Sequence, residues 1–135
     1  MASIADLRRK IVTLAIAAGE AHIPSALSIL DLLHVLYTRS ITENDSVILS
    51  KGHGCLALYV VLNEVGIISD EVLNSFCKEG SPLQGHPERN PELGIIATTG
   101  SLGHGGPMSV GVALAKEIKK QPGRVFCLVG DQNDI

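Results

Sequence analysis

Tryptophan is absent from the sequence, and aromatic residues of all kinds make up only 3% of it. Hydrophobic residues nevertheless account for 45% of the 135 residues, so we expect one domain with a core of aliphatic side chains. Long apolar runs are also missing. Asn63 and Glu64 interrupt the best candidate, so no stretch reaches the roughly 18 residues that a membrane-spanning helix needs. We therefore expect no membrane partner.

The patterns that usually mark disulfides, metal sites and nucleotide sites are missing too. The three cysteines are widely spaced without a C-x-x-C, which argues against a disulfide framework or structural zinc and favours a reducing, cytoplasmic setting. No H-E-x-x-H occurs. Ser50-Lys51-Gly52 has the wrong order for a Walker loop, and Met108 stands where a dinucleotide-binding loop has its third glycine. The net charge of -3 argues against a nucleic-acid partner.

Hydrophobic spacing and capping residues predict mainly helices, separated by short apolar strands. Arg8-Arg9-Lys10 before an apolar stretch resembles a secretory leader, but the i, i+3, i+7 spacing of the apolar residues favours an amphipathic helix. Ser25 is the expected cap of the second helix, because Pro24 disfavours helical backbone at Ile23. We expect helices over residues 3–19, 25–37, 55–65, 69–78 and 105–120, strands over 45–50, 93–98 and 124–129, and a long loop over 79–94.

Residues 98–106 form a glycine-rich loop directly before the last predicted helix. Its four glycines, between Gly100 and Gly106, allow backbone to approach a ligand closely. The helix start adds free N–H groups and the positive end of the helix dipole. An anion-binding loop and a plain turn are equally compatible with this stretch taken alone.

The run from Arg124 to Val129 is apolar after its first residue, as expected of a strand covered on both faces of a parallel sheet. It ends at Gly130-Asp131. Ligands of open α/β sheets bind beyond the carboxyl ends of the strands. Asp131 therefore stands where a carboxylate associated with a metal or phosphate belongs.

Four histidines lie in predicted loops at the ends of secondary-structure elements, whereas His34 falls inside a predicted helix. Each loop histidine alone is more typical of a solvated loop. Together they suggest a site with several proton donors and acceptors near an anionic cofactor. They are His22, His53, His86 and His104.

Four motifs, in this order, make the sequence resemble a known family. Essentially the whole chain is similar to the N-terminal, diphosphate-binding half of transketolases, in particular to the small N-terminal subunit of split transketolases. The motifs are Ser50-Lys51-Gly52-His53, Gly85-His86-Pro87, Thr99–Gly105 and Val129-Gly130-Asp131.

The resemblance implies a three-layer α/β, thiamine diphosphate-binding fold with a mostly parallel sheet, here an incomplete one in a single partial domain of residues 1–135. It implies thiamine diphosphate and Mg²⁺ (or Ca²⁺) as cofactors, and transfer of a two-carbon ketol unit from a ketose phosphate to an aldose. His22, His53, His86 and His104 would then be the catalytic, proton-transferring residues. Asp131 would bind the cation. The cofactor would be held by His53, Gly100, Ser101, Leu102, Gly103, His104, Gly130 and Asp131.

The C-terminal residues depart from the family pattern, which continues its Gly-Asp with a glycine and an acidic residue. This chain instead has Gln132-Asn133-Asp134-Ile135, similar to a later family segment that completes the cation shell. One hypothesis is that Asn133, through its side chain, and Ile135, through its backbone carbonyl, also bind the metal. The alternative, which we favour, is a truncated domain whose tail resembles that segment by coincidence.

The family builds each active site between two domains or chains, and this sequence lacks the pyrimidine-binding domain. The resemblance therefore implies a C-terminal transketolase subunit as partner, a sugar phosphate as substrate and an oligomer as the active form. An apolar sheet edge beside residues 124–129 would favour such pairing.

Two alternatives stay open. One is a catalytically inactive fragment or assembly subunit. The other is a different thiamine-dependent ketol or acyl transferase, such as one similar to deoxyxylulose phosphate synthase. The separate Gly85-His86-Pro87 loop favours the transketolase branch over the latter.

Overall fold

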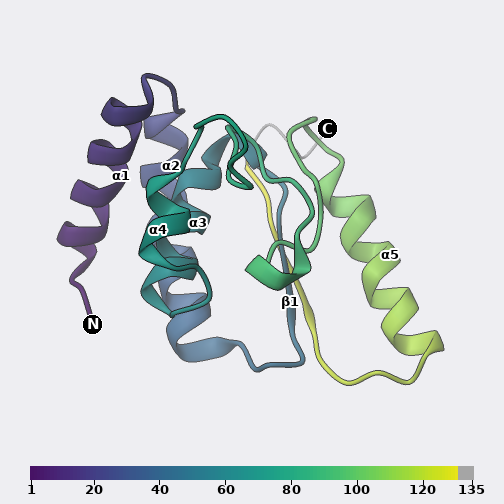
Figure 1. Cartoon of the computed structure of the whole chain (residues 1–135). Coiled ribbons are helices and arrows are strands. Elements are labelled where there is room, and N and C mark those ends of the chain that lie inside the picture. The colour runs from purple at the N-terminus through teal and green to yellow at the C-terminus, as the bar shows by residue number, and fades with distance from the viewer. Residues whose placement is uncertain (131–135) are drawn as a thin grey trace.

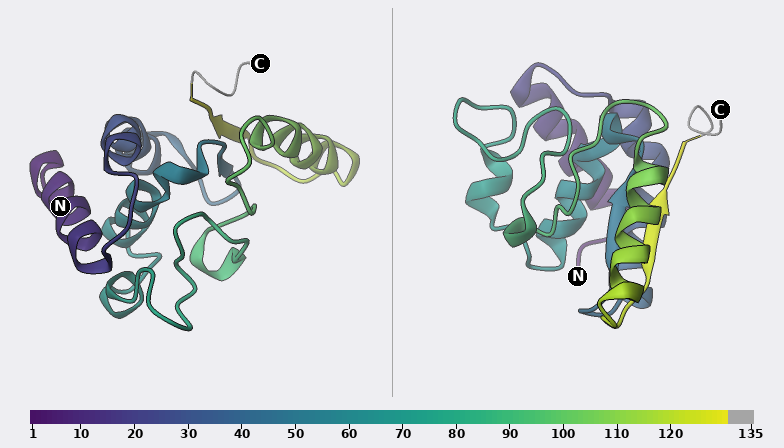
Figure 2. Two further views of the ribbon diagram at one scale, coloured as in Figure 1. Left: turned by 90° about the horizontal axis from the view of Figure 1, so that it is seen from above. Right: turned by 90° about the vertical axis from the view of Figure 1, so that its right-hand side faces the viewer.

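The fold is known from a computed structural model of the chain, which describes residues 1–130. A layer of helices covers one face of a small parallel sheet, and one long helix covers the other face (Figures 1 and 2), so the expected three-layer α/β arrangement is confirmed. The α-helices are α1 (Ile4–Ala18), α2 (Ile23–Val35), α3 (Cys55–Glu64), α4 (Asp70–Asn74) and α5 (Gly105–Ile118). The strands are β1 (Ser46–Leu49) and β2 (Val125–Leu128), and single turns of other helix types are η1 (Leu36–Ser40), η2 (Gly52–Gly54) and η3 (Pro91–Leu93).

Helix α3 is the centre of the core. Every residue from Cys55 to Leu62 is buried, because this helix is apolar on all sides and so can pack against neighbours all round. It packs against α1, α2 and α4. The largest buried side chains around it are Leu7, Ile11, Leu30, Leu33, Ile68 and Leu73.

The first helix ends where its sequence predicts. Ser3 and Asp6 form a capping box at its start, and Gly19 ends it in a left-handed conformation with φ of 73°. Ser69 likewise caps α4, accepting a hydrogen bond from the Val72 backbone N–H. These signals are local, so the sequence carries them in full.

Three predicted elements are wrong in type or extent. No strand forms over 93–98, because Pro91 starts a 3-10 turn and Gly94 ends it with φ of 75°, leaving one antiparallel bridge from Asn90 to Ile95. Helix α2 begins at Ile23 and not at Ser25, since proline needs no N–H partner in a first helical turn. The helix predicted over 69–78 is short and stops at Asn74.

Strands β1 and β2 are parallel and in register from Ser46 opposite Val125 to Leu49 opposite Leu128. β1 is buried, whereas residues 125–127 of β2 are only half-buried. The strand predicted over 124–129 is therefore present, but the described residues do not cover both of its faces. Helix α5 packs on one face, and β1 is its one neighbouring strand among those residues.

An ion pair fixes the start of the sheet. The Arg124 backbone N–H and guanidinium donate to the Asp45 carboxylate at 2.6 and 2.9 Å, and the Thr42 N–H donates to it at 2.9 Å. These hydrogen bonds, the one from the Arg124 side chain first, hold the pKa of Asp45 well below its usual range. The pair therefore ties together two segments that lie 79 positions apart in the sequence.

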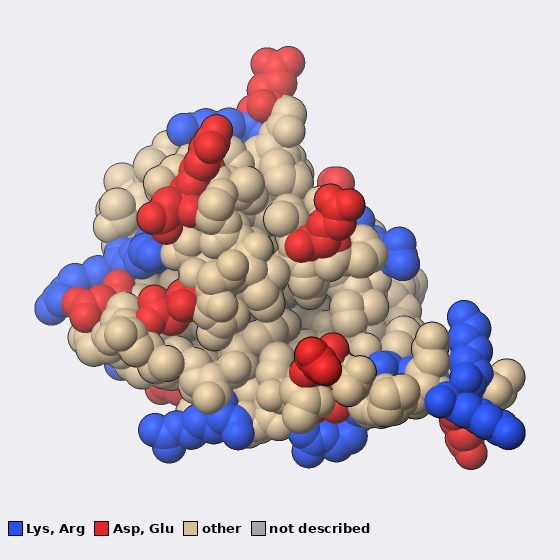
Figure 3. All heavy atoms as spheres, turned by 60° about the horizontal axis from the view of Figure 1, so that its bottom comes forward, with Lys and Arg blue, Asp and Glu red and all other residues tan. Residues whose placement is uncertain are grey.

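Charged residues are dispersed over the surface that Figure 3 shows, where Lys and Arg alternate with Asp and Glu around an uncharged hollow. Within residues 1–130, no helix is both long enough and apolar enough to cross a lipid bilayer.

Replacing Asp45 with Asn is expected to lower the melting temperature at pH 7. Because the folded-state pKa of Asp45 is depressed, its stabilising contribution is present above its ordinary pKa of 3.8 and is lost as the pH falls further. The difference between wild type and variant should therefore shrink below about pH 4, as followed by circular dichroism melts.

Asp31→Asn is the matched control. Asp31 pairs with Arg8 at 2.8 Å, but both side chains are largely exposed, so its loss should change the melting temperature much less. Equal effects of the two substitutions at pH 7 would contradict the assigned role of Asp45.

Candidate functional site

Three of the four predicted histidines meet in one pocket. Its volume is about 460 Å³, and the rings of His22 and His53 are 5.1 Å apart, edge to face. The three imidazoles come from separate segments of the chain, before α2, after β1 and in the 79–94 loop. The lining residues are Glu20, Ala21, His22, His53, Gly85 and His86.

Local structure fixes the position of His22. It is the N-cap of α2, and its Nδ1 accepts a hydrogen bond from the Ser25 backbone N–H at 3.3 Å. An imidazole whose Nδ1 accepts must carry its proton on Nε2 when it is neutral. The same contact explains why the helix begins earlier than predicted, since the cap is His22 in place of Ser25.

His53 lies in the short turn η2 between the end of β1 and the start of α3. Burial lowers the pKa of His53, and the nearby charges of His22, Lys51 and His86 lower it further. A lowered pKa favours the neutral imidazole, which can accept a proton near neutral pH.

Lys51 and Glu20 belong to this neighbourhood but were missed as individual site residues. Lys51 is buried, and its Nζ donates to Ser28 Oγ at 2.8 Å. The position of Lys51, directly after an apolar strand and before a glycine, is the sequence signal that could have marked it as a site residue. Glu20 follows the Gly19 helix cap, and nothing in its sequence context distinguishes it from a surface carboxylate.

The glycine-rich loop packs against this pocket. Thr99 Oγ1 donates to the Leu49 carbonyl at 2.7 Å, which ties the loop to the end of β1. A Cβ on Gly52 would lie 2.7 Å from the Gly100 nitrogen, and one on Gly100 would lie 2.9 Å from Cδ2 of His86. Glycine is therefore required for the loop to reach both the His53 turn and the His86 ring.

The end of this loop leads into α5 beside a buried hydroxyl. A Cβ on Gly105, the first residue of α5, would collide with the Ser50 side chain. Ser50 is fully buried, and its Oγ has no hydrogen-bond partner among residues 1–130. A free hydroxyl, a buried lysine nearby and a helix start form a set of donors that suits a phosphate group.

The structure does not gather every predicted residue. Ser101, Leu102 and His104 are exposed and do not line the histidine pocket, while Gly103 and Gly130 are half-buried. Asp131, Asn133 and Ile135 lie outside the described residues. Within the described part, no group of three or more His, Cys, Asp or Glu side chains is arranged to hold a metal ion.

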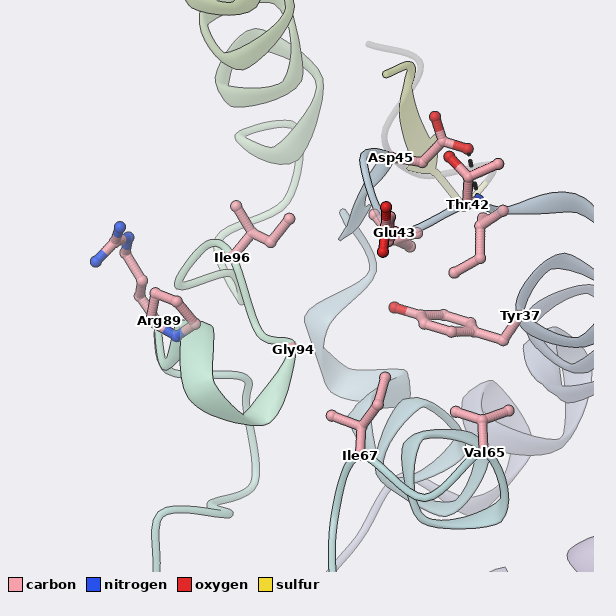
Figure 4. Close-up of a pocket in the computed structure, with 12 residues that line it drawn as sticks. Tyr37, Thr42, Glu43, Asp45, Val65, Ile67, Arg89, Gly94 and Ile96 are labelled. Carbon is pink, nitrogen blue, oxygen red and sulfur yellow. Dashed lines mark hydrogen bonds between the residues drawn. The ribbon is translucent and has the colours of Figure 1, made fainter. Parts of the chain in front are cut away.

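A second cavity, of about 610 Å³, lies between the 89–96 segment and the start of β1 (Figure 4). Tyr37 points its hydroxyl into it, and Val65, Ile67 and Ile96 give it apolar walls. Of its two carboxylates, Glu43 and Asp45, the latter is already paired with Arg124, and no histidine is among the residues that line it, so this cavity offers less acid–base chemistry than the histidine pocket.

Comparison with known proteins decides the family. Residues 2–124 match the family described as transketolase, thiamine diphosphate binding domain. The chain belongs to this transketolase family. It is 36% identical over 122 residues to the 6-deoxy-6-sulfo-D-fructose transketolase subunit SqwG of Clostridium sp. (strain MSTE9), covering 84% of this chain and 44% of that protein.

Two other transketolases are also similar to this chain. One subunit of the apulose-4-phosphate transketolase of Actinobacillus succinogenes is 36% identical over 135 residues, covering 93% of this chain and 49% of that protein. Transketolase from Leishmania mexicana has a similar structure, with a TM-score of 0.81 and 26% identity over 98% of this chain and 23% of that one. The chain thus spans less than half the length of these transketolases.

The contact between Gly105 and Ser50 can be tested by adding one methyl group. Gly105→Ala should destabilise the fold by about 1–3 kcal/mol, because the Cβ overpacks a site that is already closed. The free energy of unfolding from urea titration measures this change.

Gly106→Ala is the matched control, since a Cβ on Gly106 meets open space. Alanine also favours a helix over glycine, so this variant should be equally or more stable by up to about 1 kcal/mol. Similar losses in both variants would contradict the proposed close packing at Gly105.

Proposed function

We propose that this chain is the diphosphate-binding part of a thiamine diphosphate-dependent transketolase. The assembled enzyme would transfer a two-carbon ketol unit from a ketose phosphate to an aldose. The observation that carries this proposal is the pocket where His22, His53 and His86 converge beside the glycine-rich loop. The family match and the subunit names of two relatives support it. Three free cysteines support a cytoplasmic setting.

The residues present fit thiamine diphosphate as a ligand. Ser50 has a buried hydroxyl without a partner among residues 1–130, and Gly105, the first residue of α5, lies against it. His53, Lys51 and the 100–104 loop would hold the cofactor, with Gly130 and Asp131 at the end of β2. When bound, the cofactor would supply an electron sink for cleavage of a carbon–carbon bond.

The histidines would divide the proton transfers among them. His22 holds a proton on Nε2 in its neutral form, because its Nδ1 accepts from Ser25, so it can donate to a substrate oxygen. His53, with its lowered pKa, is suited to accept a proton. We assign His86, and His104 at the start of α5, to the same site as further catalytic residues.

The divalent cation is the second proposed cofactor. Carboxylate oxygen is a preferred ligand of Mg²⁺ and Ca²⁺, so Asp131 would hold the cation, which would supply positive charge for the diphosphate. Asn133 and Ile135 are the proposed further ligands. Asp131 immediately follows Gly130 at the carboxyl end of β2, which supports its assignment as the first protein ligand.

A C-terminal transketolase subunit is the proposed partner, and α5 is the surface proposed to bind it. No residue from Gly105 to Ala115 carries a charge, yet Val110, Leu114 and Ile118 are 68%, 54% and 71% exposed. An apolar helix face of this kind is typical of an interface. It begins at the glycine-rich loop, so a partner bound there would also complete the site.

Binding of thiamine diphosphate with Mg²⁺ tests the proposal, measured by calorimetry on the chain alone and together with the C-terminal subunit. We expect binding and ketol transfer with the subunit present. Asp131→Asn should weaken cofactor binding at least about tenfold because the cation loses a charged ligand, whereas His34→Gln, in helix α2, should not. No binding in either preparation would overturn the proposed function.

Leu114→Glu tests the proposed interface. The added carboxylate would have to be buried without a partner, so affinity for the C-terminal subunit should fall at least about tenfold in sedimentation or calorimetric titrations. The isolated chain should keep its melting temperature, because Leu114 is more than half exposed.

Gln121→Glu, which adds the same charge at an exposed position beyond α5, should leave that affinity unchanged. Unaltered binding by the Leu114 variant would place the interface elsewhere.

A further inference from the structure

The segment that carries His86 is a long loop, yet specific hydrogen bonds to α3 hold it in place. The Tyr59 hydroxyl donates to the Gln84 carbonyl at 3.0 Å. The Cys55 thiol donates to the Gly85 carbonyl at 3.2 Å and also lies 3.6 Å from that of Gln84. Two successive peptide groups directly before His86 are therefore bound to one helix.

Both donors are buried in an otherwise apolar helix. Tyr59 is 0% exposed and Cys55 is 2% exposed, and four residues separate them, so they share one face of α3. A buried hydroxyl without a partner costs free energy, which gives Tyr59 a strong preference for the loop carbonyl. Burial also raises the pKa of Cys55 to about 12, so its thiol stays protonated and remains a donor.

The loop is fixed on its other side as well. The Thr99 backbone N–H donates to the Pro87 carbonyl at 3.1 Å, and Gly100 lies against the His86 ring. His86 is thus held between α3 and the glycine-rich loop. Gly85 has no side chain to restrict its backbone, so the bonds from Tyr59 and Cys55 supply the restraint that its sequence lacks.

We propose that Tyr59 and Cys55 are positioning residues that set the place of the His86 imidazole in the histidine pocket. They touch neither substrate nor cofactor, and act through the carbonyls of Gln84 and Gly85. This role in catalysis rests on the proposed transketolase function, but the positioning itself is a property of the chain alone. The hydroxyl of Tyr59 is the main restraint, since a phenolic O–H is a stronger hydrogen-bond donor than a thiol.

Tyr59→Phe removes the hydroxyl and keeps the ring. In NMR pH titrations of the chain without cofactor, the His86 ring signals should shift and broaden. The pKa of His53 should rise toward its ordinary value, because the charge of His86 is one of the causes that lower it. Tyr37→Phe is the control, since this ring lines the second cavity and its loss of a hydroxyl should leave both histidines unchanged.

Cys55 supplies a second, milder test should Tyr59→Phe fail to fold. Cys55→Ala should produce the same changes in smaller size, and Cys55→Ser, which restores a donor, should reverse them. Histidine titrations identical to wild type in the folded Tyr59 variant, or in Cys55→Ala if that variant alone folds, would overturn the proposal.

Kinetics of the enzyme reassembled with a C-terminal subunit give the catalytic readout. Misplacing a catalytic group by about 1 Å can reduce a rate on the order of 100-fold, so Tyr59→Phe should lower kcat by about 10- to 100-fold and change KM less. Absence of ketol transfer in the wild type would overturn the proposed function alone, because the NMR titrations decide the positioning role without it.

Discussion

The close approach of residues 99–105 to the carboxyl end of β1 is the constraint on which the rest of the site depends. Thr99 binds the Leu49 carbonyl, Gly52 leaves room for the Gly100 backbone, and Gly105 rests on Ser50. Each contact joins segments about fifty residues apart, and each requires a small side chain on one partner. Because of these contacts, the turn bearing His53 and the start of α5 adjoin the same strand end.

This arrangement concentrates positive potential in one place. Burial first, and then the charges of His22, Lys51 and His86, lower the pKa of His53, while Glu20 is the carboxylate among the residues that line the pocket. These neighbours disfavour protonation of His53, and a cluster of this kind favours an anionic ligand, because binding of negative charge relieves the repulsion. The pocket's chemistry and the family's diphosphate cofactor therefore agree for a physical reason.

The sequence predicted the features that depend on short-range chemistry, including the extent of the first helix and the strands over 45–50 and 124–129. From their common position in loops at the ends of elements, it also predicted that His22, His53, His86 and His104 share a site; the first three line one pocket, whereas His104 does not. The 93–98 strand failed because turn formation at Pro91 and Gly94 outweighed the apolar pattern. The bonds from Tyr59 and Cys55 to the Gln84 and Gly85 carbonyls depend on tertiary contacts, which no local pattern encodes. The cap at His22 is a local contact, but the sequence offered Ser25 as the expected cap.

The two sides of α5 differ in a way that explains why the site is only partly enclosed. Toward the sheet, Gly105 and Ser109 are buried, and the Ser109 hydroxyl donates a hydrogen bond to the Gly105 carbonyl at 2.7 Å. On the outer side, Val110 and Leu114 are exposed, and a Cβ added to Gly106 or Gly111 would meet nothing within 4 Å among the residues described. A helix that is uncharged over most of its length, as α5 is over residues 105–115, gains its stability mainly from burial. Leu102 and His104, which directly precede α5, are exposed as well, so the uncovered side of the helix adjoins the uncovered end of the glycine-rich loop.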